Sequence, residues 1–415
     1  MLRFRCFWAR WKPRTRAVRL AVTGAMFAIA IMAWASPAGA TFSGRDGALL
    51  VSTGGFGTWS PFPTLSSAPQ ARAAECGYPS TLWTAWPDGS HQIGLRHGDT
   101  GLFSPRGQRL AIDYGGDPCY AGTGTDPSAG LFVSDANGAG RHRIGGQGLV
   151  GWLPGGRLLV WKRSADQVQL LDPMAGLVIM TVPALSLEPG LFSLSCSARL
   201  AVVRHTPHGY HIDVFTRKAA RVQGRPGVRI VAQQVAASRY PLQNPTWSPD
   251  GRSLLFSHQD TRGDIGPTSL WSVGAGGSAL HRLSDPHGAA ESDPAWSPDG
   301  RQILFIRTRA NAHSATVLQM VVMRSNGSDQ NVLVHFPADD SIENALWAPN
   351  GQSIAFYPWD GLWIVDANTG VRTATIPFEG AGLVDWQALP GGRTVRCADP
   401  MSVPITVQPP LIGRG

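Results

Sequence analysis

A repeated hairpin sequence most constrains how this chain can fold. The stretch SDPAWSPDGRQILF, residues 292–305, has a close copy in QNPTWSPDGRSLLF from Gln243 and a looser one in ENALWAPNGQSIAF from Glu343. The tryptophans of the three copies lie 49 and 51 residues apart. A period of this length is typical of a repeated supersecondary unit.

Each copy predicts a β-hairpin. In WSPDGRQILF, Pro298 suits the first corner of a tight turn, and Gly300 supplies the positive φ that ends it. The apolar run that follows returns as the second strand, and the large indole of Trp296 is placed to pack against a neighbouring sheet. Asp299 lies between Pro298 and Gly300 and is expected to be a turn residue, as are its equivalents in the other two copies.

Weaker copies extend the repeat to seven anchor hairpins. They include LFSPRGQRLAI and LSCSARLAVV, and the anchors that carry tryptophan are Trp152, Trp247, Trp296, Trp347 and Trp386. A second hairpin type, such as LWSVGAGGSALHRL from Leu270, alternates with the anchors. Two hairpins per period make a four-stranded sheet of about 50 residues. We therefore predict an all-β fold, a single β-propeller of seven four-stranded blades, with six or eight blades left open.

The two ends of the repeat predict how the ring closes. A second-type hairpin at Leu82 has no anchor before it, and the anchor at Trp386 has no second hairpin after it. Pairing these orphan hairpins completes one blade and removes exposed sheet edges. Either residues 48–52 or residues 393–397 could supply its second strand.

The W-S-P-D-G-R hairpin, followed by an L-W-x-V hairpin, resembles the TolB-like family of WD-repeat-like β-propellers. The similarity spans the chain after residue 40 and is strongest at Trp247, Trp296 and Trp347. The resemblance implies a TolB propeller domain without the N-terminal α/β domain of TolB. Because of that difference, we do not expect this chain to have the specific role of TolB.

The first 40 residues have the pattern of a secretory signal. Seven basic residues and no acid lie in residues 1–19, an apolar stretch covers residues 20–34, and Ala38-Gly39-Ala40 follows. We predict a signal peptide over residues 1–40 and a propeller over residues 41–415, with an uncleaved signal anchor as the alternative. The protein is then exported and lies in the periplasm, in the cell envelope or outside the cell, with a membrane contact only through an uncleaved leader.

The net charge argues against a nucleic-acid partner. The whole chain carries +8, but without the leader 29 basic residues face 28 acidic ones. No electrostatic excess is then left to release counterions from phosphate. We predict no nucleic-acid partner.

The cysteines and histidines are candidates for disulfides and metal ligands. We predict a disulfide between Cys76 and Cys119, since both lie in Gly/Pro-rich segments of an exported chain, although four cysteines allow three pairings. Cys196 is expected to be a buried small hydrophobe. His205, His208 and His211 do not share one face of a strand, so we predict no metal.

Polar residues recur three positions before each strong tryptophan, at Asn244, Asp293 and Asn344. Each would open an innermost strand, so the three could form a ligand-binding ring at the mouth of the central channel. The alternative is structural, because Asn-Pro and Asp-Pro start turns through their own side-chain hydrogen bonds. Asn344, which no proline follows, fits this alternative least well.

The motifs leave two classes of function. No G-x-S-x-G, P-loop, H-E-x-x-H or EF-hand pattern occurs in the sequence. We predict a monomeric, non-enzymatic scaffold that needs no cofactor and binds a protein or peptide at the channel mouth. The alternative is a carbohydrate-active or other hydrolytic or lyase propeller with Asp293 and Glu291 as general acid and base.

Overall fold

The computed structural model describes residues 44–53, 80–115, 128–145, 148–162, 167–174, 177–183, 191–222, 225–261, 267–310, 316–336, 342–358, 361–378, 381–391 and 397. All of the regular secondary structure in these residues is β-strand, so the predicted all-β class is confirmed. In this part of the chain no helix is both long and apolar enough to cross a membrane. Residues 1–43, with the predicted leader, lie outside the described residues.

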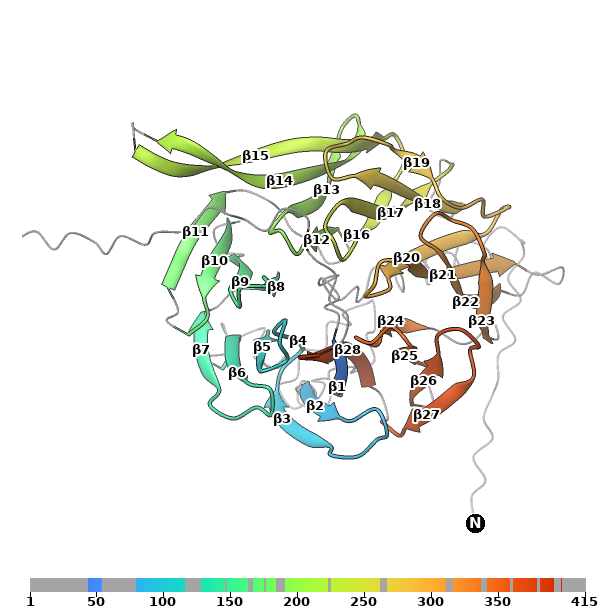
Figure 1. Ribbon diagram of the computed structural model, residues 1–415, viewed down its shortest axis with the longest axis horizontal. Coiled ribbons are helices and arrows are strands. Elements are labelled where there is room, and N and C mark those ends of the chain that lie inside the picture. Colours follow the sequence, from blue (N-terminus) through green and yellow to red (C-terminus); the bar gives the residue numbers. More distant parts are fainter. Residues whose placement is uncertain are drawn as a thin grey trace, which may run out of the picture.

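Four-stranded antiparallel units follow one another around a ring (Figure 1). The unit that joins the two ends of the chain has the order β28 (Ala381–Leu389), β1 (Arg45–Thr53), β2 (Thr81–Ala85) and β3 (Ile93–His97). The next three units, each from innermost to outermost strand, are β4 (Thr100–Phe103), β5 (Arg109–Tyr114), β6 (Gly130–Asp135), β7 (His142–Gly145); β8 (Gly148–Trp152), β9 (Leu158–Lys162), β10 (Gln167–Asp172), β11 (Leu177–Pro183); and β12 (Phe192–Leu194), β13 (Leu200–Thr206), β14 (Gly209–Val222), β15 (Arg225–Ser238).

The last three units complete the ring. They are β16 (Leu242–Trp247), β17 (Ser253–Gln259), β18 (Thr268–Gly274), β19 (His281–Arg282); β20 (Ala290–Trp296), β21 (Gln302–Ala310), β22 (Thr316–Arg324), β23 (Asn331–Phe336); and β24 (Glu343–Trp347), β25 (Ser353–Tyr357), β26 (Leu362–Asp366), β27 (Arg372–Ile376). One parallel pair, Thr268 with Ala290, joins the first two of these units into an eight-stranded sheet. The described strands thus fit the seven-bladed arrangement.

Contacts between innermost strands run all the way around the ring. Each of β4, β8, β12, β16, β20, β24 and β28 contacts the next, and β28 contacts β4. The ring closes by antiparallel pairing of β28 with β1, in which Leu49 faces Trp386. Of the two segments left open for this blade, the one around residues 48–52 therefore supplies the second strand.

The Ser-Pro-Asp-Gly sequence explains the sharp turn between the first two strands of a blade. Gly300 has a φ of 73°, and its N–H donates to Ser297 O at 2.8 Å. The Ser297 hydroxyl donates to Asp299 Oδ1 at 2.7 Å, and Arg301 N–H donates to the same oxygen at 3.0 Å. The recurring aspartate is therefore a turn residue. In the weakest repeat Ala198 takes this place with a φ of 59°, a conformation that glycine tolerates better.

The repeated tryptophans are buried and link neighbouring blades. The five predicted anchors are between 2% and 7% exposed. Trp152 Nε1–H donates to Leu102 O at 2.8 Å, and Trp247 Nε1–H donates to Ser193 O at 3.2 Å. Each of these carbonyls lies on the innermost strand of the preceding blade, so the indole both fills the core and fixes the next blade.

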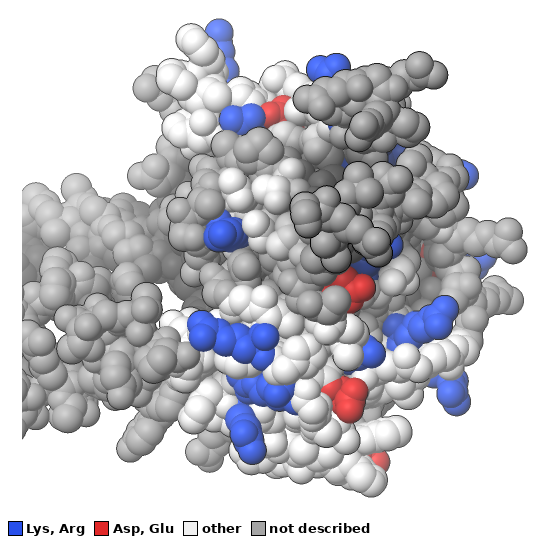
Figure 2. Space-filling view, turned by 90° about the vertical axis from the view of Figure 1, so that its left-hand side faces the viewer, with Lys and Arg blue, Asp and Glu red and all other residues white. Residues whose placement is uncertain are grey.

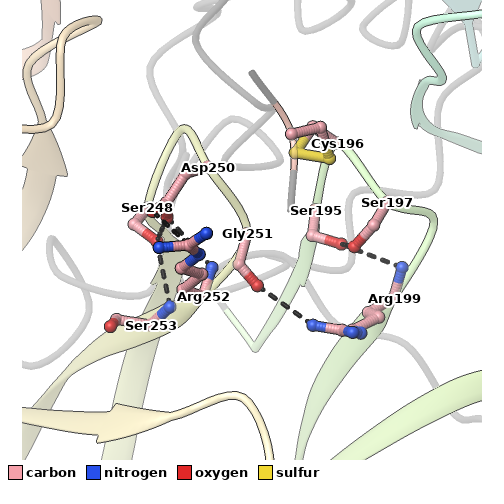
Figure 3. The surroundings of a disulfide bond; sticks show 10 residues. Ser195, Cys196, Ser197, Arg199, Ser248, Asp250, Gly251, Arg252 and Ser253 are labelled. Carbon is pink, nitrogen blue, oxygen red and sulfur yellow. Dashed lines mark hydrogen bonds and ion pairs between the residues drawn. A yellow bond between two sulfur atoms is a disulfide. The ribbon is translucent and has the colours of Figure 1, made fainter. Parts of the chain in front are cut away.

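A disulfide ties the C-terminal end of the described chain to a distant blade. Cys196, in the turn between β12 and β13, bonds to Cys397, 201 residues further along the chain (Figure 3). The expectation that Cys196 is a free buried hydrophobe is therefore wrong, because the chain returns to it after β28. Beside it, Arg199 Nη1 donates to Gly251 O at 3.1 Å and joins this turn to the next one. Cys76 and Cys119 lie outside the described residues, so their pairing stays a prediction.

Candidate functional site

Two of the three predicted channel-mouth residues lie at matching irregularities of adjacent innermost strands. The β16–β17 register shifts between Gln243 and Thr246, and the β20–β21 register shifts between Ser292 and Ala295. Asn244 and Asp293 lie inside these shifts with φ values of 50° and 52°. Asn and Asp adopt this left-handed conformation more readily than most residues. A bulge of this kind re-aims a side chain.

The bulges bring the side chains of Asn244 and Asp293 together across two blades. Asn244 Nδ2 donates to Asp293 Oδ1, and the Ser292 hydroxyl donates to Asp293 Oδ2 at 2.8 Å. The amide therefore reaches the next blade instead of bonding only within its own turn. Asn344 lies at a third shift, between Glu343 and Leu346, but its side chain lies outside the described ones.

Asp293 is the ionisable member of this pair. It is exposed, yet the surrounding protein displaces part of its water, and this burial raises the pKa of the Asp293 carboxyl. The hydrogen bonds from Ser292 and Asn244 oppose the rise. Each carboxylate oxygen keeps a further lone pair, so Asp293 can accept a donor from a bound molecule.

Glu291 does not share this site. Its side chain is fully buried, and Arg307 donates to its Oε1 from Nε at 2.9 Å and from Nη2 at 2.7 Å. Ser284 Oγ donates to the other carboxylate oxygen. The predicted role of Glu291 as a partner of Asp293 in acid–base chemistry is therefore wrong, since both of its oxygens are taken by structural contacts.

A further acid lies on an innermost strand and was not predicted from the sequence. Asp385 lies on β28, and Phe103 N–H of β4 donates to its Oδ2 at 2.7 Å. Burial raises the pKa of Asp385 to about 7, although the backbone hydrogen bonds from Phe103 and Trp386 oppose the rise. The only signal in the sequence was a charged residue directly before an anchor tryptophan.

The raised pKa of Asp385 predicts how stability depends on pH. The folded chain holds a proton that the unfolded chain releases above about 4, so the free energy of unfolding falls as pH rises from about 4 to about 7. Asp385→Asn keeps an oxygen for Phe103 N–H and removes the titration. We expect this variant to be more stable than the parent by up to about 4 kcal/mol at pH 8 and to differ little at pH 4.

Urea unfolding of both proteins at pH 4, 6 and 8 measures this difference. Asp299→Asn, in an exposed turn, is the matched control and should follow the parent at each pH. If the free energy of unfolding changed with pH equally in the parent and in Asp385→Asn, titration of Asp385 could not be the cause of that change.

Asn244 and Asp293 lie near the start of their innermost strands, on the face where the second strand of each unit ends. The chain leaves β1 and β5 on this face, and 27 and 15 residues separate these strands from β2 and β6 in the sequence. We call this the loop-rich face. The Ser-Pro-Asp-Gly turns and the Cys196–Cys397 disulfide lie on the opposite face. Among the described residues no three His, Cys, Asp or Glu side chains are arranged to hold a metal ion. In the histidine cluster considered from the sequence, His205 stacks on Tyr210 with ring centroids 4.5 Å apart.

Basic side chains gather on the outer side shown in Figure 2, below its middle, at about the height of β7 in Figure 1. In the β14–β15 hairpin, Lys218 and Arg229 face each other in register, and both are exposed. Residues 214–238 contain five basic residues and no acid. Like charges placed directly opposite one another are unfavourable in a sheet.

Comparisons with known proteins found similar solved structures. No family model and no curated protein matches the chain. Similar solved structures include TolB from Acinetobacter baumannii, 14% identical over 90% of this chain and 73% of that one with a TM-score of 0.42, and a putative TolB from Agrobacterium tumefaciens, 14% identical over 76% and 100% with a TM-score of 0.39. The chain resembles TolB-like β-propellers. An oligogalacturonate lyase in complex with manganese is also similar, at 12% identity over 72% of this chain and 85% of that one with a TM-score of 0.49. At these identities the TolB-like resemblance is one of fold, as the repeated hairpins predicted.

Proposed function

We propose that this TolB-like chain is an exported, monomeric scaffold that binds a protein or peptide at the centre of its loop-rich face. The observation that carries the proposal is the Asn244–Asp293 pair, in which two adjacent blades present an amide and a carboxylate at the same place. Such a pair suits the N–H groups or basic side chains of a peptide segment. The acidic partner of Asp293 that a hydrolase would need is not supplied by Glu291, and this favours binding over catalysis at this site.

The export part of the proposal rests on residues 1–40. We expect signal peptidase to cut after Ala40, so the mature protein should begin at Thr41. Intact-mass measurement of protein recovered from the envelope or the medium reads this terminus directly. A chain that keeps residue 1 and stays with the membrane would support the signal anchor instead.

The binding part predicts a specific loss in one variant. Asp293→Asn keeps the left-handed conformation and the side-chain size but removes the charge. We expect about a tenfold or larger loss of affinity for the partner, because a hydrogen bond to a charged group is worth about 1.5–3 kcal/mol. Affinity capture from envelope extracts, with the parent, Asp293→Asn and the opposite-face control Asp299→Asn, measures it. Equal capture by all three would contradict the site, and no capture together with turnover of a polysaccharide by the purified protein would contradict the scaffold.

A further inference from the structure

A serine, a histidine and an aspartate meet on the loop-rich face, away from the centre of the ring. Ser238 ends β15, His258 lies near the end of β17, and Asp260 follows that strand. Ser238 Oγ lies 2.8 Å from His258 Nε2, and His258 Nδ1 lies 3.2 Å from Asp260 Oδ1. In the tautomer that satisfies both contacts, Nδ1–H donates to the carboxylate and Nε2 accepts the serine proton.

The surrounding side chains hold the imidazole and the carboxylate in place. Ser269 Oγ donates to Asp260 Oδ1 at 2.8 Å, and Arg282 Nη2 donates to Asp260 Oδ2 at 2.9 Å. The Trp271 ring meets the His258 ring edge-on with centroids 5.4 Å apart, and its Nε1–H donates to Ser269 Oγ at 3.0 Å. Both ring nitrogens of His258 thus have fixed partners.

The serine hydroxyl combines a fixed position with access from solvent. Tyr240 N–H donates to Ser238 Oγ at 2.9 Å, which leaves the oxygen a second lone pair. Ser238 is half-buried, and the side chains of His258 and Asp260 are 19% and 22% exposed.

We propose that Ser238, His258 and Asp260 form a hydrolytic triad that cleaves small, exposed acyl esters. A base in contact with the nucleophile, oriented by a third group, defines such a triad by geometry on unrelated folds, without a G-x-S-x-G sequence. This activity goes beyond the binding role and does not depend on it. The sequence hid the triad because two neighbouring blades contribute its members.

The reaction needs no other reagent than water. Ser238 Oγ attacks the ester carbonyl and passes its proton to His258 Nε2, and the ester C–O bond breaks as the leaving alkoxide takes that proton. Water then attacks the acyl-serine, gives a proton to Nε2 and releases the carboxylic acid, while the serine oxygen regains its proton. Asp260 is a positioning residue that keeps Nδ1–H in place.

Covalent labelling of the full chain tests the triad. With a fluorophosphonate probe we expect an adduct on Ser238, located by peptide mass mapping, and with p-nitrophenyl acetate we expect catalysed hydrolysis. Ser238→Ala and His258→Gln should each reduce labelling and hydrolysis by about a thousandfold or to background. Ser278→Ala, at an exposed turn serine, should leave both unchanged.

The same contacts also join β15 to β17, so a second variant separates chemistry from folding. Asp260→Asn keeps a side chain of the same shape but favours the wrong tautomer. We expect it to lose labelling while its unfolding temperature stays near that of the parent. Absence of a Ser238 adduct on the folded parent, or labelling that His258→Gln and Asp260→Asn leave intact in folded protein, would overturn the proposal.

Discussion

Arg307→Met is expected to lower the free energy of unfolding by about 4 kcal/mol. Arg307 is 6% exposed and Glu291 is fully buried, so loss of the guanidinium leaves the Glu291 carboxylate without a counter-charge inside the protein. Nη2 of Arg307 also donates to Gln330 Oε1 at 2.5 Å, which ties β21 to the turn before β23. Urea unfolding at pH 7 measures the change.

Two comparisons make this prediction specific. Arg324→Met removes an ion pair to Asp329 in which both side chains are more than 60% exposed, and it should cost about 1 kcal/mol or less. The double variant Glu291→Leu/Arg307→Met removes both buried charges and should recover much of the loss. Equal losses of unfolding free energy in Arg307→Met and Arg324→Met would show that the buried pair contributes no more to stability than the exposed one.

Loss of the Cys196–Cys397 disulfide is expected to have a comparable effect. The bond closes a loop of 201 residues, and the entropy of such a loop in the unfolded chain corresponds to about 5 kcal/mol in the chain-entropy model. Cys397→Ser should therefore lower the unfolding temperature markedly under oxidising conditions.

The single bond provides its own controls. Cys196→Ser, Cys397→Ser and the double variant should be equally unstable, because each lacks the same bond. Adding a reductant should bring the parent close to these variants and leave them unchanged. A parent whose unfolding temperature is the same with and without reductant would contradict a stabilising role for this disulfide.

The parts of the fold that depend on local sequence were predictable. Pro298, Asp299 and Gly300 encode their turn within a few residues, and a period near 50 residues implies stacked four-stranded sheets. The orphan hairpins at Leu82 and Trp386 indicated the joint between the two ends of the chain. Local patterns could not choose its second strand, because that choice depends on pairing between β1 and β28 across the whole chain.

The candidate site was predictable only in outline. Repetition indicated Asn244 and Asp293, but their contact forms between blades, where local sequence gives no signal. Glu291 was misassigned for the same reason, since its partner Arg307 lies on the next strand and decides its role. Cys397 and Asp385 likewise acquire their environments from segments about 200 and 280 residues away in the sequence.

Site-specific photo-crosslinking in the cell envelope tests the central claim most directly. A photoreactive residue at Gln243, beside Asn244 on the loop-rich face, is compared with one at Asp299 in a turn of the opposite face. We expect one discrete protein adduct from position 243, weakened by Asp293→Asn, and none from position 299. Adducts of equal yield from both positions, or none from position 243 in intact cells, would contradict a binding scaffold with its site at the centre of this face.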